Sequence, residues 1–228
     1  MADHLISYLK VDSHKKLFVV GDLHGCYGLL LEELKKINFN FASDLLICTG
    51  DLIDRGNENL ECISLLNQPW FRTVRGNHEE MCIKGQYDTN IRDIHIRNGG
   101  EWFYGLPQQK QLEISNKFME LPVVIEIELE GKKIGIVHAD IDIQDWNIFK
   151  QDIFKGDYKI PGITSSYSNA LWGRGRIRNY SNHYDIVENI NEIYLGHTIV
   201  KEYTKIDNCH YIDVGSSFTS KLCIIKVQ

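Results

Sequence analysis

Three apolar segments in the first third of the chain each run directly into a short polar segment. Residues 15–20 (KKLFVV) precede GDLHG, residues 44–50 (DLLICTG) precede DLIDRG, and residues 71–74 (FRTV) precede the polar loop RGNHEEM. Between them, apolar residues recur at helical spacing in 27–39, and a short helix is predicted at 59–66. This alternation predicts β-α-β units, in which the segments that follow the strands meet at one edge of a sheet.

The remaining sequence predicts a mixed sheet and helical cover. Residues 85–121 are polar and predict two short helices separated by Pro107, forming a cap-like segment. In residues 123–140, apolar and charged residues alternate on either side of Glu130-Gly131, which is a β-hairpin signal. EIYLGHT, YIDVGS and KLCIIKV predict closing strands, which we expect to be antiparallel. The predicted fold class is therefore α/β, an α+β sandwich of mixed β-sheets flanked by helices.

Composition limits the class of protein. The 228 residues are 43% hydrophobic, which suits one domain over residues 1–228, and the formal net charge of −6 argues against general binding to nucleic acid or anionic membranes. The N-terminus lacks the pattern of a signal peptide, and no stretch approaches 18 uninterrupted apolar residues. We expect a soluble, cytoplasmic protein, for which a monomer needs no further assumption.

Metal-ligand residue types follow five separate predicted strands. They occur in GDLHG (21–25), GDLIDRG (50–56), RGNHE (75–79), HAD (138–140) and GHT (196–198). Any one of them is weak evidence, because a lone histidine near a strand end is more often structural. Clustered carboxylates repel one another unless cations lie between them, so the set indicates a metal site. In extended backbone Asp22 and His24 would point the same way.

GDLHG, GDLIDRG and RGNHE, in this order and spacing, resemble the metallophosphoesterase signature of the protein serine/threonine phosphatases. NGGEWF, HAD, LWGR, GHT and YIDVGS also occur in the order expected for the bacteriophage lambda type of this family. The resemblance covers nearly the whole chain. It implies a metallophosphoesterase (calcineurin-like) fold.

The resemblance also implies a site with two divalent metal ions. It assigns Asp22, His24 and Asp51 to the first ion, and Asp51 as a bridge to the second ion, which Asn77, His138 and His197 complete. Oxygen and imidazole donors without thiolates suit manganese best, with iron or zinc as alternatives.

Phosphate binding and proton transfer need further groups. Guanidinium groups suit phosphoryl oxygens, and Arg55 and Arg75 lie inside the motifs. The resemblance adds Arg174, with Arg176 and Arg178 as competitors; without the motifs, that run is interpreted as a solvated basic loop. It also implies that His78 protonates the leaving oxygen while Asp54 holds the other ring nitrogen.

Other residues have less specific interpretations. Glu79 is predicted to be structural, in contact with a helix N-terminus. Asp140 is expected either to orient His138 or to accept from backbone amides. Trp102 and Phe103 are expected to pack, with the lining of a substrate groove as the alternative. The remaining histidines are predicted not to be ligands: His4, His14, His95, His183 and His210.

The predicted function is that of a metal-dependent serine/threonine protein phosphatase, in which a metal-bridging hydroxide attacks phosphorus directly. Phosphorylated proteins or peptides are the expected partners, with phosphotyrosine and aryl phosphates as further substrates. The alternatives within the fold are a diadenosine tetraphosphatase and a cyclic phosphodiesterase. The symmetrical tetraphosphatases usually carry glutamine at the position of His24, which favours the protein phosphatases. A non-catalytic phosphopeptide-binding protein is a further alternative, against which the complete set of site residues argues.

Overall fold

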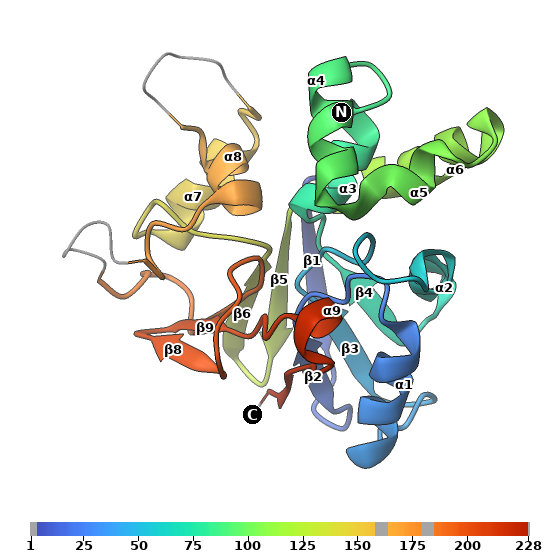
Figure 1. The fold of residues 1–228 in the computed structure, drawn as a ribbon. Helices are drawn as coiled ribbons and strands as arrows, with labels where there is room; N and C mark the ends of the chain where they lie inside the picture. The colour runs from blue at the N-terminus through green and yellow to red at the C-terminus, as the bar shows by residue number, and fades with distance from the viewer. Residues whose placement is uncertain (1–3, 158–163, 179–184, 228) are drawn as a thin grey trace.

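The computed structural model describes residues 4–157, 164–178 and 185–227. Within these ranges the strands form a four-stranded sheet of order β10-β2-β3-β4 and a six-stranded sheet of order β1-β5-β6-β7-β9-β8 (Figure 1). The strands are β1 (Ile6–Val11), β2 (Leu17–Val20), β3 (Leu45–Cys48), β4 (Phe71–Thr73), β5 (Val124–Leu129), β6 (Lys132–Val137), β7 (Glu192–Leu195), β8 (Thr204–Ile206), β9 (Cys209–Tyr211) and β10 (Ile224–Lys226).

The helices cover the outer faces of the sheets and connect the strands. They are α1 (Tyr27–Lys36), α2 (Asn59–Ser64), α3 (Asn77–Lys84), α4 (Thr89–His95), α5 (Glu101–Tyr104), α6 (Gln108–Met119), α7 (Trp146–Ile153), α8 (Ser166–Trp172) and α9 (Ser216–Thr219). A 3₁₀ turn η1 (Leu65–Asn67) follows α2, and a π turn η2 (Ile96–Gly100) joins α4 to α5. No helix among the described residues is both long and apolar enough to cross a bilayer.

The four-stranded sheet has the predicted parallel core. Val20 of β2 lies opposite Cys48 of β3, and Cys48 lies opposite Thr73 of β4. The three strands therefore end level with one another, so the polar segments that follow them lie at one edge. The short strand β10 adds to β2 in the antiparallel direction, as predicted.

The six-stranded sheet is mixed, but its strand directions differ from our expectation. The β5–β6 hairpin is antiparallel, and positive φ at Glu130 (51°) and Gly131 (80°) forms its predicted turn. The prediction that the closing strands are antiparallel is wrong for β7 and β9, which run parallel to β6. The segment with α7 and α8 separates β6 from β7 and is long enough for the crossover that parallel pairing needs. Strand β1, which we did not predict, pairs in parallel with β5.

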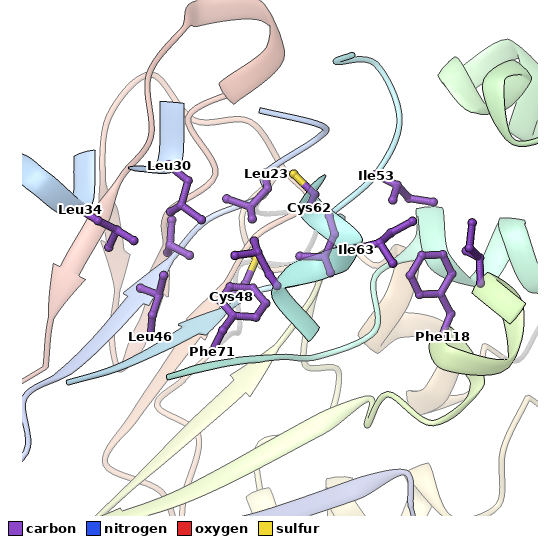
Figure 2. Close-up of a cluster of buried hydrophobic side chains, with 14 of the residues drawn as sticks. Leu23, Leu30, Leu34, Leu46, Cys48, Ile53, Cys62, Ile63, Phe71 and Phe118 are labelled. Carbon is purple, nitrogen blue, oxygen red and sulfur yellow. The ribbon is translucent and has the colours of Figure 1, made fainter. Parts of the chain in front are cut away.

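Alternate side chains of the strands enter different hydrophobic layers. Val19 and Ile47 of the small sheet meet Ile125 and Ile134 of the large sheet, and this layer holds the sheets together. Leucine and phenylalanine side chains of the opposite face pack under α1, α2 and α6; Figure 2 shows Leu30, Leu34, Leu46, Phe71 and Phe118 in this cluster. Burial on both faces explains why the strands are continuous apolar runs. The predicted α/β sandwich with mixed sheets is confirmed.

The loop predicted over RGNHEEM is shorter than expected, because helix α3 begins at Asn77. The Glu79 carboxylate accepts a hydrogen bond from the Gly76 backbone N–H (2.8 Å), which caps the first turn. Glu79 and Glu80 both lie in this turn, where the helix dipole favours negative charge. Asn77 and His78 consequently lie buried at a helix N-terminus.

Residues 85–121 are helical on both sides of Pro107, as predicted. Pro107 precedes the first residue of α6, a position where the missing N–H costs nothing. Both α4 and α6 pack against α3, so this segment is attached to the helix that carries Asn77 and His78.

Candidate metal centre

The segments that follow β2, β3, β4, β6 and β7 meet and are joined by backbone hydrogen bonds. Leu23 and His24 donate their N–H groups to the Asp51 carbonyl (3.1 and 2.9 Å), and Gly196 donates to the His138 carbonyl (2.8 Å). Several non-glycine residues in these segments have positive φ: His24, Asp51, Asp54, Arg55 and His197. Such conformations are costly and cluster at functional sites. His24 is therefore not in the extended backbone that we expected.

Two histidines are oriented by backbone carbonyls. His24 Nδ1 lies 2.9 Å from the Ile53 oxygen and His138 Nδ1 lies 2.8 Å from the Thr49 oxygen. Each ring therefore donates through Nδ1 and turns its Nε2 toward the candidate site. Burial lowers the pKa of His24 to about 3, so the ring is neutral at pH 7.

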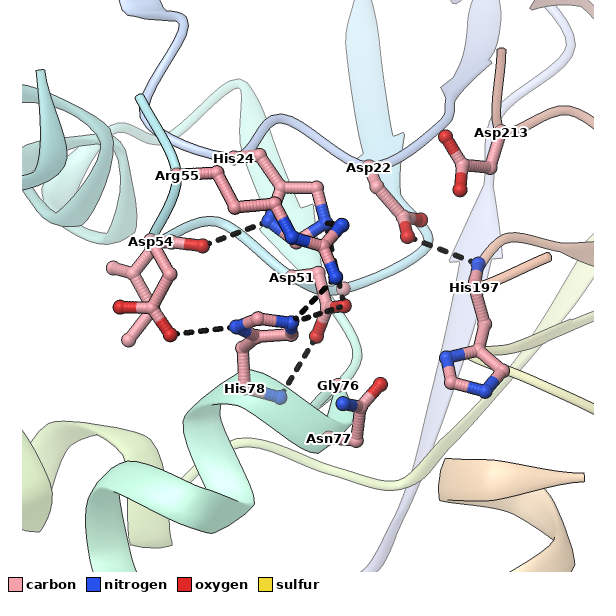
Figure 3. Close-up of polar contacts among 12 residues, drawn as sticks. Asp22, His24, Asp51, Asp54, Arg55, Gly76, Asn77, His78, His197 and Asp213 are labelled. Carbon is pink, nitrogen blue, oxygen red and sulfur yellow. Dashed lines mark hydrogen bonds and ion pairs between the residues drawn. The ribbon is translucent and has the colours of Figure 1, made fainter. Parts of the chain in front are cut away.

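Asp51 lies at the centre of the candidate site (Figure 3). Its Oδ2 is 3.6 Å from His24 Nε2, 3.4 Å from His138 Nε2 and 3.9 Å from His78 Nε2. The donor atoms form two groups, His24–Asp51–His78 and Asp51–His138–His197, each within 4.8 Å. Asp51 belongs to both, which is the arrangement expected of a bridging ligand.

Asn77 and Asp22 extend these groups in different ways. Asn77 Oδ1 is 2.8 Å from His138 Nε2, so both atoms face the second group. The buried Asp22 carboxylate accepts from Thr49 Oγ1 (3.0 Å) and from the His197 N–H (2.9 Å). Asp22 thus contacts His197 of the second group, and the first group contains His78 in place of the Asp22 that the resemblance assigns.

Asp213 is a site residue that the sequence analysis missed. It follows β9, is 1% exposed and lies beside Asp22, whose pKa is raised by burial and by the Asp213 charge. One oxygen accepts from the Gly215 N–H (2.8 Å). The signal was present, since YIDVGS places an aspartate just after a strand, as the other motifs do.

The donors present fit divalent metal ions. In the part of the chain that the structure describes, His197 Nε2 and Asp213 Oδ2 are buried without a hydrogen-bond partner. The pKa of His138 is raised to about 10, because the Asp51 and Asp22 carboxylates outweigh the effect of burial. Positive charge is therefore stabilised here. Imidazole nitrogen with carboxylate and amide oxygen suits manganese, iron or zinc.

Arg55 points into the first group. Its guanidinium donates to His24 Nε2 (2.7 Å) and to His78 Nε2 (3.1 Å), and it lies 5.5 Å from the Phe218 ring centroid. A cation thus already occupies the position on which these nitrogens converge.

The predicted contact between His78 and Asp54 is present. His78 Nδ1 lies 2.6 Å from Asp54 Oδ2, and both side chains are fully buried. Burial opposes ionisation of Asp54, yet hydrogen bonds from His78 and His95 lower its pKa to about 2. The carboxylate is therefore charged and orients the ring, while His78 as proton donor stays a prediction.

Glu79 joins two of the motifs, in keeping with its predicted structural role. Besides the Gly76 amide it accepts from the backbone N–H groups of Asp51 (3.0 Å) and Leu52 (2.8 Å). Burial and the nearby Asp51 raise the pKa of Glu79 to about 7.

The structure resolves the two interpretations of Asp140 in favour of backbone contacts. Its carboxylate accepts from the N–H groups of Ile141 (2.8 Å) and Arg176 (3.0 Å), whereas His138 Nδ1 contacts Thr49. His4 and His14 are exposed, and His210 contacts Tyr203. His183 lies outside the described residues.

Arg75 is buried in contacts that differ from those of a phosphate clamp. Its guanidinium donates to Glu80 (3.1 Å), to Tyr167 Oη (3.2 Å) and to the carbonyls of Met119 (2.6 Å) and Leu121 (3.1 Å). These contacts attach the end of α6 to the loop before α3. The phosphate role of Arg75 stays a prediction.

Arg75→Gln therefore tests which role dominates. Because it removes the charge-assisted hydrogen bond to buried Glu80, which keeps only Lys84 as an ion-pair partner, we expect the free energy of unfolding in urea to fall by about 2 kcal/mol. KM for a phosphomonoester should change little. A large rise in KM at unchanged stability would instead support phosphate binding.

Comparison with known proteins identifies relatives along almost the whole chain. Residues 15–212 match the family model described as calcineurin-like phosphoesterase. The chain is 36% identical to serine/threonine-protein phosphatase 2 of Salmonella typhimurium, over 98% of this chain and 99% of the relative. It is 26% identical to the asymmetrical bis(5'-nucleosyl)-tetraphosphatase PrpE of Oceanobacillus iheyensis, over 91% and 86% of the two chains.

A solved structure shares the fold at low sequence identity. The cold-active protein-tyrosine phosphatase of a psychrophilic Shewanella species superposes with a TM-score of 0.63 at 19% identity, covering 97% of this chain and 78% of that one. The family match spans the motifs from GDLHG to GHT, which supply the two groups around Asp51. The chain belongs to the calcineurin-like phosphoesterase family.

Proposed function

We propose that this protein is a metal-dependent phosphomonoesterase that acts on phosphoserine and phosphothreonine in proteins, and also on phosphotyrosine and aryl phosphates. The observation that carries the proposal is Asp51 shared between two groups of donor atoms, with His78 held by Asp54 beside it. The names of relatives such as the Salmonella phosphatase support the same substrate class.

Separate sets of residues would bind the metal ions and the phosphate. Asp22, His24 and Asp51 would hold one divalent ion, and Asp51, Asn77, His138 and His197 the other, with manganese as the proposed metal. When bound, the two ions supply the Lewis acidity that activates a water for attack on phosphorus. Arg55 and Arg174 bind the phosphoryl oxygens, and His78 gives a proton to the departing serine oxygen.

Arg174 is favoured over Arg176 as the second clamp. Arg174 is half-buried and donates to Thr198 Oγ1 (3.0 Å), next to His197. Arg176 is 1% exposed and donates to the Asp185 carbonyl (2.9 Å), away from the donor groups. A clamp must reach the ligand, and the half-buried position of Arg174 next to His197 supports it over the fully buried Arg176.

Alanine at these two positions should have different effects. Because a charge-assisted hydrogen bond contributes about 1.5 to 3 kcal/mol, Arg174→Ala should lower kcat/KM roughly 10- to 100-fold and weaken inhibition by inorganic phosphate. Arg176→Ala should lower the melting temperature more than it lowers kcat/KM. The reverse pattern, read from the same assays, would make Arg176 the clamp.

A diadenosine tetraphosphatase is the second candidate, favoured by the Oceanobacillus relative. Comparing kcat/KM for a phosphoserine peptide, a phosphotyrosine peptide and diadenosine tetraphosphate separates the two. We expect the phosphoserine peptide to be preferred, with Asp51→Asn inactive on all three. Preference for diadenosine tetraphosphate would replace the proposed substrate class. An inactive wild type that still bound phosphopeptide would indicate a non-catalytic binder.

A further inference from the structure

The Asp54 carboxylate is held by three donors, of which His78 is only one. His95 Nε2 lies 2.8 Å from Oδ2, and Trp102 Nε1 donates to Oδ1 at 2.7 Å. His95 and Asp54 are both fully buried. The other nitrogen of His95 lies 3.0 Å from Tyr104 Oη, so the ring accepts there and donates to Asp54. Each oxygen of the buried Asp54 carboxylate thus accepts a hydrogen bond from the 95–104 segment.

The Gly99-Gly100 turn of NGGEWF lets the 95–104 segment come close to the loop that carries Asp54 and Arg55. Gly99 has φ +100°, and a Cβ on it would lie 2.7 Å from the Arg55 backbone nitrogen. A Cβ on Gly100 would lie 2.2 Å from the His95 ring. The π turn η2 contains both glycines, and such turns often occur at functional sites. Glycine at position 99 thus allows close packing against the loop that carries Arg55, and glycine at position 100 leaves room for the His95 ring.

We propose that His95 and Trp102 are positioning residues for proton donation. They fix the Asp54 carboxylate, which in turn orients the His78 ring that faces the leaving oxygen. This inference rests on the proposed function, because it assumes that His78 is the proton donor. The cap-like segment is then part of the catalytic support, and Trp102 contacts Asp54 in addition to packing on Phe103 (ring centroids 5.9 Å apart).

Leaving-group dependence separates positioning from packing. A serine alkoxide needs a proton to leave, whereas p-nitrophenolate hardly does. Residues that support a catalytic group typically cost about 10- to 100-fold when altered, so Trp102→Phe and His95→Leu should lower kcat on a phosphoserine peptide by that factor. On p-nitrophenyl phosphate kcat should fall only a few-fold, and KM should change little for both substrates. His95→Gln, which keeps a donor, should recover part of the lost rate.

Trp146→Phe is the matched control, because Trp146 is buried and also donates to a carboxylate, that of Glu126 (2.7 Å) in β5 of the six-stranded sheet. It should leave the ratio of the two rates unchanged. Circular dichroism establishes that each variant is folded. If Trp102→Phe does not fold, the comparison of His95→Leu with His95→Gln tests the inference. Equal losses on both substrates, or no recovery with glutamine, would overturn the inference. If His78→Asn itself does not change the ratio of the two rates, the part of the proposed function that makes His78 the proton donor fails instead.

Discussion

Asp51→Asn is expected to lower manganese-dependent kcat/KM by roughly 10³-fold or more, because several kcal/mol of transition-state stabilisation depend on the shared carboxylate. Asparagine offers one neutral oxygen in place of the two carboxylate oxygens. The fold should survive, since the remaining oxygen can accept from the His78 N–H (2.9 Å) and asparagine tolerates the φ of +50° at this position. Phosphate release and bound manganese, measured by elemental analysis, should fall together.

Asp44→Asn provides the matched control for this effect. Asp44 is also a buried aspartate, but it accepts from the Asn40 N–H (2.9 Å) in the turn before β3. We expect it to keep its manganese and its turnover. Full activity in Asp51→Asn would mean that Asp51 does not join two metal ions.

His78→Asn is the second large effect. A positioned acid contributes typically about 10²- to 10⁴-fold, so we expect a loss of that size on phosphoserine and a smaller one on p-nitrophenyl phosphate. Asparagine at position 78, in the first turn of α3, keeps the backbone N–H that donates a hydrogen bond to the Asp51 carboxylate. Steady-state kinetics on the two substrates gives both values.

His210→Asn controls for loss of a buried histidine, since His210 stacks on Tyr194 away from the donor groups. Its turnover should match the wild type on both substrates. If His78→Asn lost the same factor on both substrates, the proton would come from another group.

Most of the site was predictable because of how parallel strands end. Strands β2, β3 and β4 are adjacent and parallel and end level with one another, so the motifs that follow them meet at one edge of the sheet. Asp22, Asp51 and Asn77 were therefore identifiable from a motif and its place after a strand. Fully buried strands such as LFVV also left little ambiguity, because both of their faces must be apolar.

The missed features depend on tertiary contacts that leave little local signal. Helix α3 is capped by Glu79, yet its first turn is so polar that RGNHEEM was interpreted as a loop. Strand β1 pairs with a segment more than a hundred residues away, and only two of its six residues are buried. The hydrogen bond from Trp102 to Asp54 joins residues 48 apart, and periodicity cannot identify such a contact.

The most direct test is phosphate release from a phosphoserine peptide by chelator-treated protein as manganese is added. We predict no turnover without metal and turnover that rises to a plateau at two manganese ions per chain. Absence of turnover with manganese, iron, zinc and magnesium would contradict a metal-dependent phosphomonoesterase centred on Asp51.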